Sequence, residues 1–530
     1  MSLRKAPLTV VDLFGRSGDF TIIEADGEIT DLTRAGLDDA ARRLASGLRA
    51  WGIRAGDRIG CWIPNGSAYL MTLAACARLG AVAVAVNTRF RSGEVQDIVG
   101  RAGCRLLLVH PGFVGIDTEG ILARLDPAGL PRLEAVVPVV GEVDTAWPSV
   151  PWGELLGPVS RGGVEGVDES SPDAPFAVFT TSGTTSAPKL VLHRQSSIVT
   201  HALDVASHFE ITPDDCSLMA LPLCGVFGLT LLTGSLAGGA RQVVCARFDE
   251  GEAARAVADH AVTLFTGTDD MIHRMLEVDG EWSTIRYSGY ARFNNALEDL
   301  PERADAAGWK LIGLYGMSEV QALYAQRDPS RPLDERIMAG GELVSSRAEA
   351  RVVDPDTDRP VDQGLDGELQ LKGPSRFAGY LAAGGDDIDH ELTRRHLTDD
   401  GWFRTGDLAR MDGPRSFEYL ARMGDVLRLG GFLVSPAEIE ARILESPGVE
   451  ATQVVAVDGE RGPRVVAFVI ADDSFDEDAA IIHCREQLAA FKVPRRIVRL
   501  DEFPMTDSAN GMKIQKVKLR EIALSSIPPQ

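Results

Sequence analysis

The hydrophobic positions in the first hundred residues alternate between two periods. Across residues 32–51, apolar side chains recur every three or four positions up to Gly52, which predicts an amphipathic helix that ends at this glycine. Residues 81–86 are apolar without a break, as is typical of a strand inside a parallel sheet. The same rhythm predicts strands at 58–63 and 105–109 and a helix at 68–79 that closes at Gly80. We therefore predict an α/β domain with helices on both faces of its sheet.

The pattern changes after about residue 340. Short β-like runs then alternate with Gly, Asp and Pro turns up to about residue 420, which predicts an antiparallel or barrel-like subdomain. The last part of the chain predicts helices at 436–445 and 478–491 and strands at 452–457 and 464–470.

The predicted fold class is α/β. It consists of a large N-terminal domain of mixed and parallel sheets flanked by helices, a β-barrel-like subdomain, and a small mobile α+β C-terminal domain. We place the boundary after Arg422, which gives domains 1–422 and 423–530.

Composition narrows the choice of partners. A chain of 530 residues is too long for one core, and 45% apolar and 25% charged residues are ordinary for a globular protein. The formal charge of −23 argues against nucleic acid or an anionic membrane as a main partner, since both require a basic surface. A small anionic ligand in a local basic pocket is still compatible with this charge. Nothing in the sequence sets the oligomeric state.

The cysteines and the N-terminal segment indicate a compartment. The seven cysteines are scattered, without a C-x-x-C pair or a His/Cys cluster, so we expect buried free thiols in a reducing environment. The sequence has no signal-peptide pattern near Met1 and no run of about 18 apolar residues. We expect a cytoplasmic protein without a metal cluster.

A hydroxyl-rich loop that ends in a lysine follows the apolar run at 175–178. Residues 179–189 read Phe-Thr-Thr-Ser-Gly-Thr-Thr-Ser-Ala-Pro-Lys. Backbone N–H groups, hydroxyls and one cation at the end of a strand suit an anion, and polyphosphate fits them well. The loop is not a Walker A loop, because Pro188 stands at the second glycine and Leu190 follows the lysine. Since such a cluster alone is more often a surface turn, its interpretation depends on the rest of the chain.

Four further motifs accompany this loop. They are Leu-Tyr-Gly-Met-Ser-Glu at 314–319, Gly-Trp-Phe-Arg-Thr-Gly-Asp-Leu at 401–408, Arg-Met-Gly-Asp at 422–425 with the glycine-containing run 430–440, and the basic run 511–520. In this order and at these separations the chain resembles the adenylate-forming superfamily, which comprises acyl- and aryl-CoA synthetases, adenylation domains of peptide synthetases, and luciferases. The resemblance covers nearly the whole chain.

The resemblance implies an AMP-forming acid–thiol ligase that uses ATP, Mg²⁺ and coenzyme A. It would activate a carboxylic acid as an acyl-adenylate, release pyrophosphate and pass the acyl group to the thiol of coenzyme A. Attack of a carboxylate on the α-phosphate brings anions together, so this reaction needs charge neutralisation and in-line positioning more than acid–base groups.

The implied catalytic residues are Lys189, Glu319 and Lys513. Glu319 would hold Mg²⁺, a hard cation that prefers carboxylate oxygen. Lys513 would reach the α-phosphate and the substrate carboxylate as a mobile point charge. The implied nucleotide-binding residues are Thr181, Ser182, Gly183, Thr184, Thr185, Tyr315, Ser318, Asp407 and Arg422.

Each part of the nucleotide has an implied partner. The loop from Thr181 to Lys189 would hold the β- and γ-phosphates, and Tyr315 would lie against the adenine. Asp407 would accept hydrogen bonds from the ribose hydroxyls, and Arg422 would assist at the ribose or phosphate.

The resemblance also implies that the C-terminal domain rotates between the two half-reactions. Gly424 lies where the hinge should pivot, and glycine accepts large φ/ψ changes at little steric cost. The face near Gly430 and Gly431 would line the tunnel for the thiol.

Some positions depart from the family pattern. Ser186 replaces a glycine of the phosphate loop, and Met512 separates Gly511 from the lysine. Lys513 keeps the K-I-x-K spacing and is therefore preferred over Lys516. The structural alternative is that these lysines begin a solvated basic helix.

The implied substrate pocket consists of Cys224, Gly225, Phe227, Asp269, Gly289, Tyr290 and Gly316. Relatives commonly carry an aromatic residue and then a histidine where Cys224 and Gly225 stand, so their loss opens or changes this region, unless it is compensated elsewhere. Asp269 or Asp270 could bind a cationic group, although such a pair is more often a helix cap with a solvated first turn. Tyr290 could shorten the pocket or fill the core.

Three alternatives stay open. The acceptor could be the phosphopantetheine thiol of a carrier protein, which the same fold would serve. The activated group could be a small oxyanion such as nitrite, trapped by an amine. The chain could also be a sensor of nucleotide or acyl-adenylate, but retention of Glu319, Asp407, Arg422 and Lys513 together argues against this. His193 and His201 are interpreted as structural.

Overall fold

The computed structural model describes residues 9–156, 167–181, 188–291, 297, 299–385, 387–424, 426–429, 432–434, 436–457, 464–488, 492–508 and 511–526. Its helices in chain order are α1 (Val10–Phe14), α2 (Arg34–Trp51), α3 (Ser67–Leu79), α4 (Ser92–Ala102), α5 (Thr118–Leu122), α6 (Trp152–Leu155), α7 (Gln195–His208), α8 (Val226–Gly238), α9 (Glu250–His260), α10 (Asp269–Leu276), α11 (Leu300–Ala306), α12 (Leu333–Arg336), α13 (His390–Arg395), α14 (Pro436–Leu444), α15 (Glu477–Gln487) and α16 (Lys516–Ser526), with 3-10 turns at Phe113–Gly115 and Pro127–Gly129.

A seven-stranded sheet forms the first half of the N-terminal domain. Its strands, in spatial order, are β19 (Gly379–Tyr380), β8 (Leu190–Arg194), β7 (Pro175–Thr180), β4 (Val82–Ala85), β3 (Arg58–Trp62), β5 (Leu106–Val109) and β6 (Ala135–Pro138). The strands from β7 to β6 run parallel. Alternate residues of β4 enter opposite cores, with Ala83 and Ala85 in one and Val82 and Val84 in the other. This burial of both faces explains the unbroken apolar runs and confirms the predicted α/β arrangement.

A second sheet of five strands packs beside the first. Its spatial order is β11 (Leu264–Phe265), β9 (Cys216–Met219), β10 (Arg241–Cys245), β1 (Phe20–Ile23) and β2 (Ile29–Leu32). The strands are parallel except β2, which pairs antiparallel with β1. Residues of α2, α3, α7 and α8 share one core with both sheets, so these helices connect them.

The third sheet has nine strands and carries most of the predicted site. Its spatial order is β12 (Gly267–Thr268), β13 (Ser288–Ala291), β14 (Leu311–Met317), β15 (Gln321–Gln326), β16 (Gly340–Leu343), β21 (Ser416–Arg422), β20 (Phe403–Gly413), β18 (Asp366–Lys372) and β17 (Glu349–Val353). The region after residue 340 is antiparallel, as predicted. These strands extend the sheet from β15 instead of forming a separate unit, because β16 pairs with both β15 and β21.

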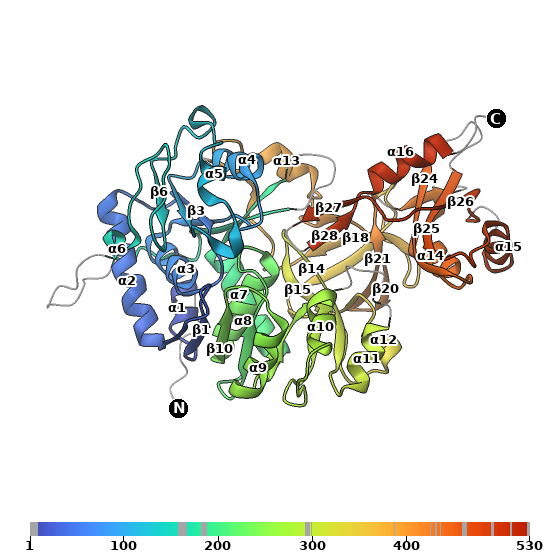
Figure 1. Ribbon diagram of the computed structural model, residues 1–530, viewed down its shortest axis with the longest axis horizontal. Coiled ribbons are helices and arrows are strands. Elements are labelled where there is room, and N and C mark those ends of the chain that lie inside the picture. Colours follow the sequence, from blue (N-terminus) through green and yellow to red (C-terminus); the bar gives the residue numbers. More distant parts are fainter. Residues whose placement is uncertain are drawn as a thin grey trace.

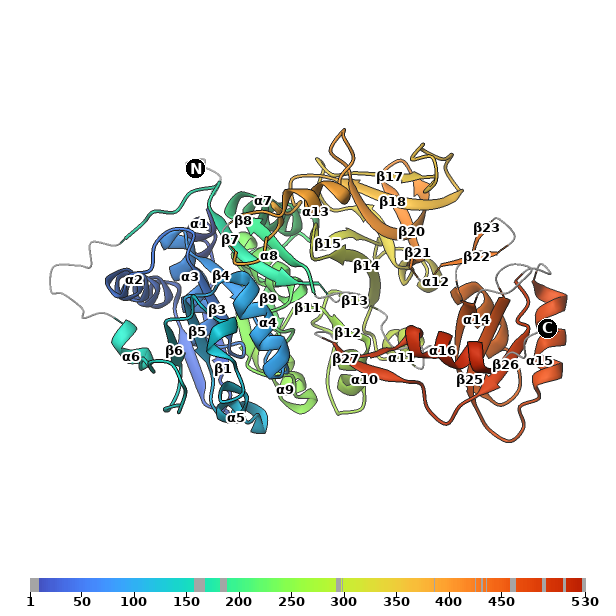
Figure 2. The same cartoon turned by 90° about the horizontal axis from the view of Figure 1, so that it is seen from above.

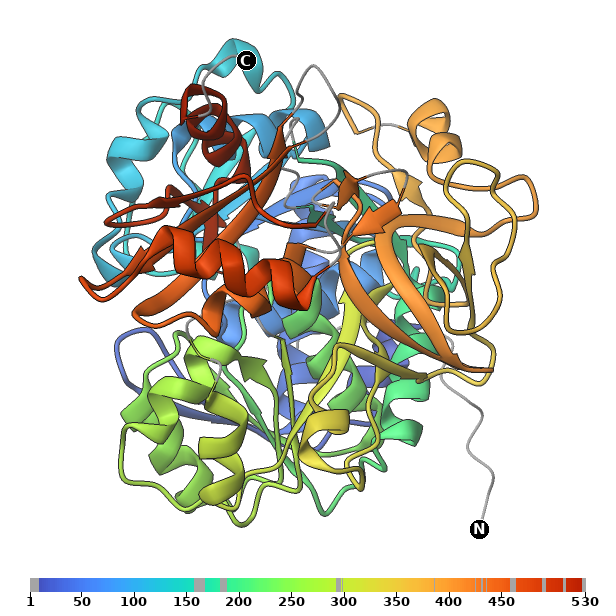
Figure 3. The same cartoon turned by 90° about the vertical axis from the view of Figure 1, so that its right-hand side faces the viewer.

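The elements after residue 426 gather at one end of the molecule (Figures 1 and 2). They form a three-stranded sheet and two hairpins, namely β24 (Val449–Val457), β25 (Arg464–Ala471) and β26 (Arg496–Arg499), β22 (Leu427–Leu429) with β23 (Phe432–Val434), and β27 (Met505–Ser508) with β28 (Gly511–Ile514). Two hydrophobic cores there contain residues of this part alone. Figure 3 looks along the molecule from this end.

Helix ends follow local chemistry. Gly52 and Gly80 adopt left-handed conformations, with φ of 115° and 64°, and end α2 and α3 as predicted. The first of these helices begins at Arg34, later than the predicted residue 32, because the Thr33 hydroxyl accepts a hydrogen bond from Gly36 N at 3.1 Å.

All seven cysteines are free thiols, six of them buried and Cys224 partly exposed. Among the described residues, none of the helices is both long and apolar enough to cross a membrane.

Candidate active site

The central feature of the site is a hydrogen-bonded group of three side chains from the nine-stranded sheet. Asp407 on β20 and Arg422 on β21 are direct cross-strand partners, and Arg422 Nη1 donates to Asp407 Oδ1 at 2.8 Å. Tyr315 on β14 donates its hydroxyl to the other oxygen, Asp407 Oδ2, at 2.6 Å. The Tyr315 ring packs against Phe417 and Tyr419 of β21, at centroid distances of 5.1 and 5.8 Å. The sequence predicted all three residues for the nucleotide site, and the fold brings them together.

The environment of Asp407 is unusual for a carboxylate. Burial raises its pKa, while Arg422 and the Tyr315 hydroxyl act in the opposite direction. The pKa of Tyr315 is raised well above its ordinary value by burial and by the charge of Asp407, so its phenol keeps its proton. A carboxylate fixed by two donors is a preorganised hydrogen-bond acceptor.

The β14–β15 hairpin presents Glu319 at its turn. Gly316 allows the two strands to approach, because a Cβ on it would lie 2.5 Å from Ala322 Cα. Two residues of the returning strand, Gln321 and Leu323, have positive φ of 68° and 57°, which is a strained conformation for side chains of this kind. The Gln321 amide holds this conformation by donating to Ser197 O at 3.0 Å and Ser375 O at 3.2 Å. Glycine is therefore required at position 316 because β14 and β15 approach each other too closely for a side chain.

Three further contacts fix the segment around Glu319. His193 Nε2 lies 2.7 Å from Ser318 O, and Phe377 N donates to Glu319 O at 2.7 Å. Tyr380 donates its hydroxyl to Glu319 Oε1 at 2.8 Å. Burial lowers the pKa of His193 to about 4, so its ring is neutral and donates through Nε2.

Glu319 is the candidate protein ligand for magnesium. Among the described residues, no group of three or more His, Cys, Asp or Glu side chains could enclose a metal ion. Glu319 is a buried carboxylate in a polar setting. Mg²⁺ bound beside a nucleotide commonly uses one or two carboxylates together with phosphate oxygens. A site of one carboxylate is thus compatible with Mg²⁺ bound to a nucleotide, and incompatible with an all-protein cage.

The phosphate loop is described only at its two ends. Ser182, Gly183, Thr184, Thr185 and Ser186 lie outside the described residues. At the ends, Thr181 and Lys189 pair through Thr181 N to Lys189 O at 3.0 Å and Lys189 N to Thr181 Oγ1 at 3.1 Å.

The Lys189 side chain reaches the neighbourhood of Glu319. Its Nζ lies 2.7 Å from His396 Nε2 and 5.0 Å from the centre of the Tyr380 ring. Burial lowers the pKa of Lys189, and the charge of Glu319 partly offsets this effect. Tyr380 thus contacts both residues, with Lys189 over its ring and Glu319 at its hydroxyl.

Lys513 lies on β28, where its backbone pairs with Thr506 of β27, and its side chain is outside the described part of the structure. Figures 1 and 2 both show this hairpin extending from the C-terminal elements toward the N-terminal domain. Gly424 has open space around its Cβ position and Arg520 Nη2 donates to its carbonyl at 3.1 Å. The division after residue 422 coincides with the end of β21 and stays a prediction. Gly430 and Gly431 lie outside the described residues.

Cys224, Gly225 and Phe227 lie at the start of α8 and are partly exposed. A Cβ on Gly225 would meet Pro222 O at 3.5 Å, an ordinary contact, so the backbone does not require glycine there. Burial raises the pKa of the Cys224 thiol to about 12, so the thiol is neutral. A Cβ at position 225 therefore meets no close contact, and the thiol at position 224 carries no charge.

The other predicted pocket residues have structural explanations. Thr268 caps α10 by accepting from Met271 N at 3.3 Å, so the acidic pair occupies the first turn after the cap instead of the cap itself. Asp270 is exposed, as expected for a solvated first turn. Asp269 is buried, so this interpretation does not apply to it. Tyr290 packs in a hydrophobic core with Trp309, which favours its packing alternative.

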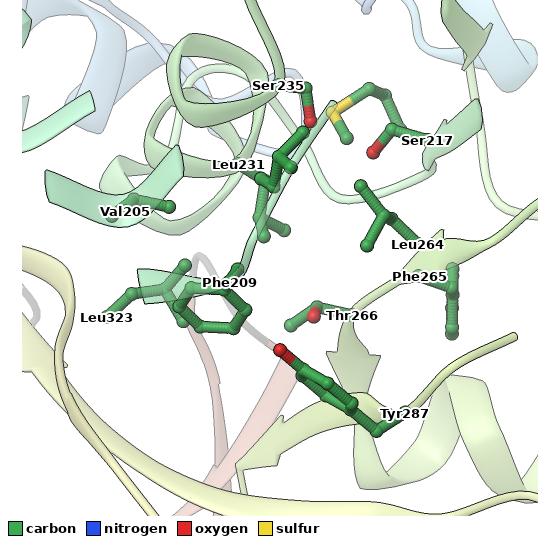
Figure 4. Close-up of a pocket in the computed structure, with 12 residues that line it drawn as sticks. Val205, Phe209, Ser217, Leu231, Ser235, Leu264, Phe265, Thr266, Tyr287 and Leu323 are labelled. Atoms are coloured by element: carbon green, nitrogen blue, oxygen red, sulfur yellow. The ribbon is translucent and has the colours of Figure 1, made fainter. Parts of the chain in front are cut away.

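Gly289 lies beside Thr266, a residue that lines a small cavity. A Cβ on Gly289 would meet Leu314 Cδ2 at 2.6 Å and Thr266 at 3.3 Å, so a larger residue there would require the Leu314 side chain to shift. The cavity lies between α7, α8 and the strands β9 and β11, and its volume is about 30 Å³. Its lining is mainly apolar, with the hydroxyls of Ser217, Ser235, Thr266 and Tyr287 among the side chains (Figure 4). That volume accommodates one or two water molecules.

Sequence reasoning missed Tyr380 and His396, which complete the surroundings of Glu319 and Lys189. It interpreted His193 and His201 as structural, and their buried bonds to Ser318 O and Ala322 O agree with this. A tyrosine or histidine standing alone in sequence has no spacing signal, so only the fold could reveal these contacts.

Comparison with known proteins decides the family. The chain matches the AMP-binding enzyme family over residues 14–381 and the AMP-binding enzyme C-terminal domain over residues 438–510. The chain belongs to the AMP-binding enzyme family. This confirms the resemblance to adenylate-forming enzymes and, with it, an AMP-forming ligase of the acyl-CoA synthetase type that uses ATP and coenzyme A.

Several relatives match almost end to end. The 3-[(3aS,4S,7aS)-7a-methyl-1,5-dioxo-octahydro-1H-inden-4-yl]propanoyl:CoA ligase of Mycobacterium tuberculosis is 30% identical over 98% of this chain and 99% of its own. A feruloyl-CoA synthase of an Amycolatopsis species is 30% identical over 91% of this chain and 93% of its own. The crystal structure of ATP-bound MatB from Rhodopseudomonas palustris has a TM-score of 0.79 at 24% identity, covering 97% of this chain and 98% of that one, which confirms the fold.

Proposed function

We propose that this AMP-binding enzyme activates a ring-containing carboxylic acid and transfers it to coenzyme A through the site described above. Asp407 receives the ribose hydroxyls, with Arg422 beside it and Tyr315 at the adenine. Glu319 is the protein ligand for Mg²⁺, and Lys189 meets the β- and γ-phosphates. Lys513 approaches the α-phosphate and the substrate carboxylate from the C-terminal domain.

One observation carries these roles. Residues from motifs 92 positions apart in sequence, Tyr315 and Asp407, share a hydrogen bond of 2.6 Å, and Arg422 completes the group. Glu319 lies in the turn of the hairpin that carries Tyr315, and Tyr380 and Phe377 hold this turn by hydrogen bonds, so the ribose acceptor and the metal ligand are fixed to the same sheet. Rigid elements hold reacting groups in line more precisely than loops do.

The chemistry of the first step follows from charge. The carboxylate and the α-phosphate are both anionic, so their approach requires cations around the phosphates. Lys189 and Arg422 supply positive charge from the N-terminal domain, and Mg²⁺ bound at Glu319 would neutralise phosphate oxygens. Expulsion of pyrophosphate leaves an acyl-adenylate that a thiolate can attack.

The proposed substrate class rests on the relatives. Two relatives are named for a bicyclic propanoate and for ferulate, which are ring-containing acids. These names favour a ring-containing acid over a long-chain fatty acid.

The names of the relatives give coenzyme A as the acceptor. The alternative acceptors are a carrier-protein thiol and an amine, and the experiment below distinguishes them from coenzyme A. We also propose a cytoplasmic location, supported by seven free thiols in the described structure.

The test is ATP-dependent pyrophosphate release over aromatic acids, alicyclic acids, a straight-chain series and nitrite, each with and without coenzyme A. The proposal predicts turnover with ring acids, stimulation by coenzyme A and a thioester product. Release that coenzyme A does not change would favour a carrier protein or an amine as acceptor. A preference for acids of twelve or more carbons would contradict the proposed substrate class.

A further inference from the structure

The amino group of Lys189 is held at a defined place by two side chains outside the sequence motifs. Lys189 directly precedes β8, and its Nζ lies 2.7 Å from His396 Nε2. The same Nζ lies 5.0 Å from the centre of the Tyr380 ring, a cation–π distance. His396 itself meets the Tyr380 ring edge to face at 5.2 Å. The lysine amine is therefore enclosed between an imidazole nitrogen and an aromatic face.

The hydrogen bonds of His396 define its tautomer. His396 Nδ1 lies 3.0 Å from Leu392 O, and a carbonyl oxygen only accepts, so Nδ1 carries the proton. Nε2 then has a free lone pair and accepts from the Lys189 ammonium. Burial and the positive charge of Lys189 lower the pKa of His396, which keeps the ring neutral. Each nitrogen of the ring has one consistent role.

The place where Lys189 is held lies beside the acidic group of the site. Tyr380, whose ring faces the amine, donates its hydroxyl to Glu319 Oε1 at 2.8 Å. The charges of Glu319 and Arg422 both act on Lys189. Tyr380 thus contacts each of the other three side chains, with His396 and Lys189 at its ring and Glu319 at its hydroxyl.

We propose that His396 is a positioning residue that holds the Lys189 amine ready for the β- and γ-phosphates of ATP. This inference rests on the proposed role of Lys189. A lysine side chain has four rotatable bonds and loses much rotamer freedom when it binds an anion. His396 restricts that freedom before the nucleotide arrives, so ATP binding meets a preorganised cation.

The proposal makes a distinction between nucleotides. AMP lacks the β- and γ-phosphates, so the affinity for AMP should not depend on the position of Lys189. If His396 merely ends α13 through its bond to Leu392 O, its loss should weaken ATP and AMP alike.

The test measures dissociation constants of Mg·ATP and AMP by calorimetry on the full chain. His396→Leu removes the acceptor, and His396→Gln restores one, because its amide oxygen and imidazole Nε2 are the same number of bonds from Cβ. We expect His396→Leu to weaken Mg·ATP by about tenfold, the effect of one hydrogen bond to a charged group, and to leave AMP unchanged. His396→Gln should bind Mg·ATP within about twofold of the natural chain.

A double-mutant cycle separates positioning from damage. Lys189→Met should weaken Mg·ATP, and adding His396→Leu should cause no further loss, because the group being positioned is already gone. His390→Leu is the matched control, since His390 lies on the same helix with its side chain 70% exposed. Melting temperatures of all variants report whether the fold is intact.

The outcomes separate failure of the proposed role of His396 from failure of the proposed role of Lys189. Equal weakening of AMP and ATP by His396→Leu, or additive losses in the double variant, would overturn the positioning role. A Lys189→Met variant that binds Mg·ATP as tightly as the natural chain would refute both the inference and the proposed role of Lys189. Weaker binding by Lys189→Met with no effect of His396→Leu would refute the inference alone.

Discussion

Acidification should destabilise the protein through His193, the histidine that supports the Glu319 segment. His193 is fully buried, and its Nε2 donates to Ser318 O at 2.7 Å. Burial lowers its pKa from 6.5 to about 4, so the fold favours the neutral ring. A group with a depressed pKa contributes stability above its unfolded-state pKa, and this contribution is lost as the pH falls toward the folded-state pKa.

The size of the effect follows from the two pKa values. Between pH 7 and pH 5 the unfolded chain takes up a proton at this histidine and the folded chain does not, which costs about 2 kcal/mol of unfolding free energy. For a domain of several hundred residues, this corresponds to a fall in melting temperature of about 2 °C. Loss of His193 should remove that share of the acid sensitivity.

The assay compares the melting temperature at pH 7 and pH 5 in the natural chain and in His193→Gln. Glutamine keeps a donor for Ser318 O but does not titrate in this range. We expect the difference between the two pH values to be smaller in the variant, whatever its absolute stability. His390→Gln, at an exposed histidine, should leave the difference unchanged. An equal acid sensitivity in His193→Gln and the natural chain would refute the reasoning.

Three further predictions test the site. Tyr380→Phe removes the hydroxyl donated to Glu319 and should raise the Mg²⁺ concentration for half-maximal pyrophosphate release about tenfold, whereas an unchanged Mg²⁺ titration would contradict this link. Gly316→Ala places a Cβ 2.5 Å from backbone and should cost about 1–3 kcal/mol, seen as a lower melting temperature, while Gly424→Ala, with open space, should not. Lys513→Ala should abolish adenylation but preserve thioester formation from supplied acyl-adenylate, and normal adenylation would remove its proposed role.

The sequence predicted the layers of the fold because their signals are local. The alternation of apolar runs and amphipathic stretches up to residue 110 reflects burial on both faces of β4 and β5, which the structure has. The association of the later strands with β15 was not predictable, because pairing across a sheet leaves no mark in the spacing of a single strand. The short apolar runs and turns predicted that these strands are antiparallel. They did not predict which strand pairs with which.

The same division applies to the site. Asp407, Arg422 and Tyr315 belong to motifs, and their mutual hydrogen bonds confirm that they lie together. Tyr380 and His396 lack a motif and were found only through contacts. Gly289 and Gly316 were predicted for the substrate pocket. In the structure Gly316 packs closely against the backbone of β15, and Gly289 packs against the Leu314 side chain. A glycine in a motif indicates that another group packs closely against the backbone there, but the sequence does not identify that group.

The most direct test of the central claim is the identity of the nucleotide product. The enzyme is incubated with ATP, Mg²⁺, coenzyme A and an acid that supports pyrophosphate release, and the products are separated chromatographically. The account predicts AMP, pyrophosphate and acyl-CoA in equal amounts. Formation of ADP and phosphate, or of a thioester without AMP, would contradict adenylation at this site.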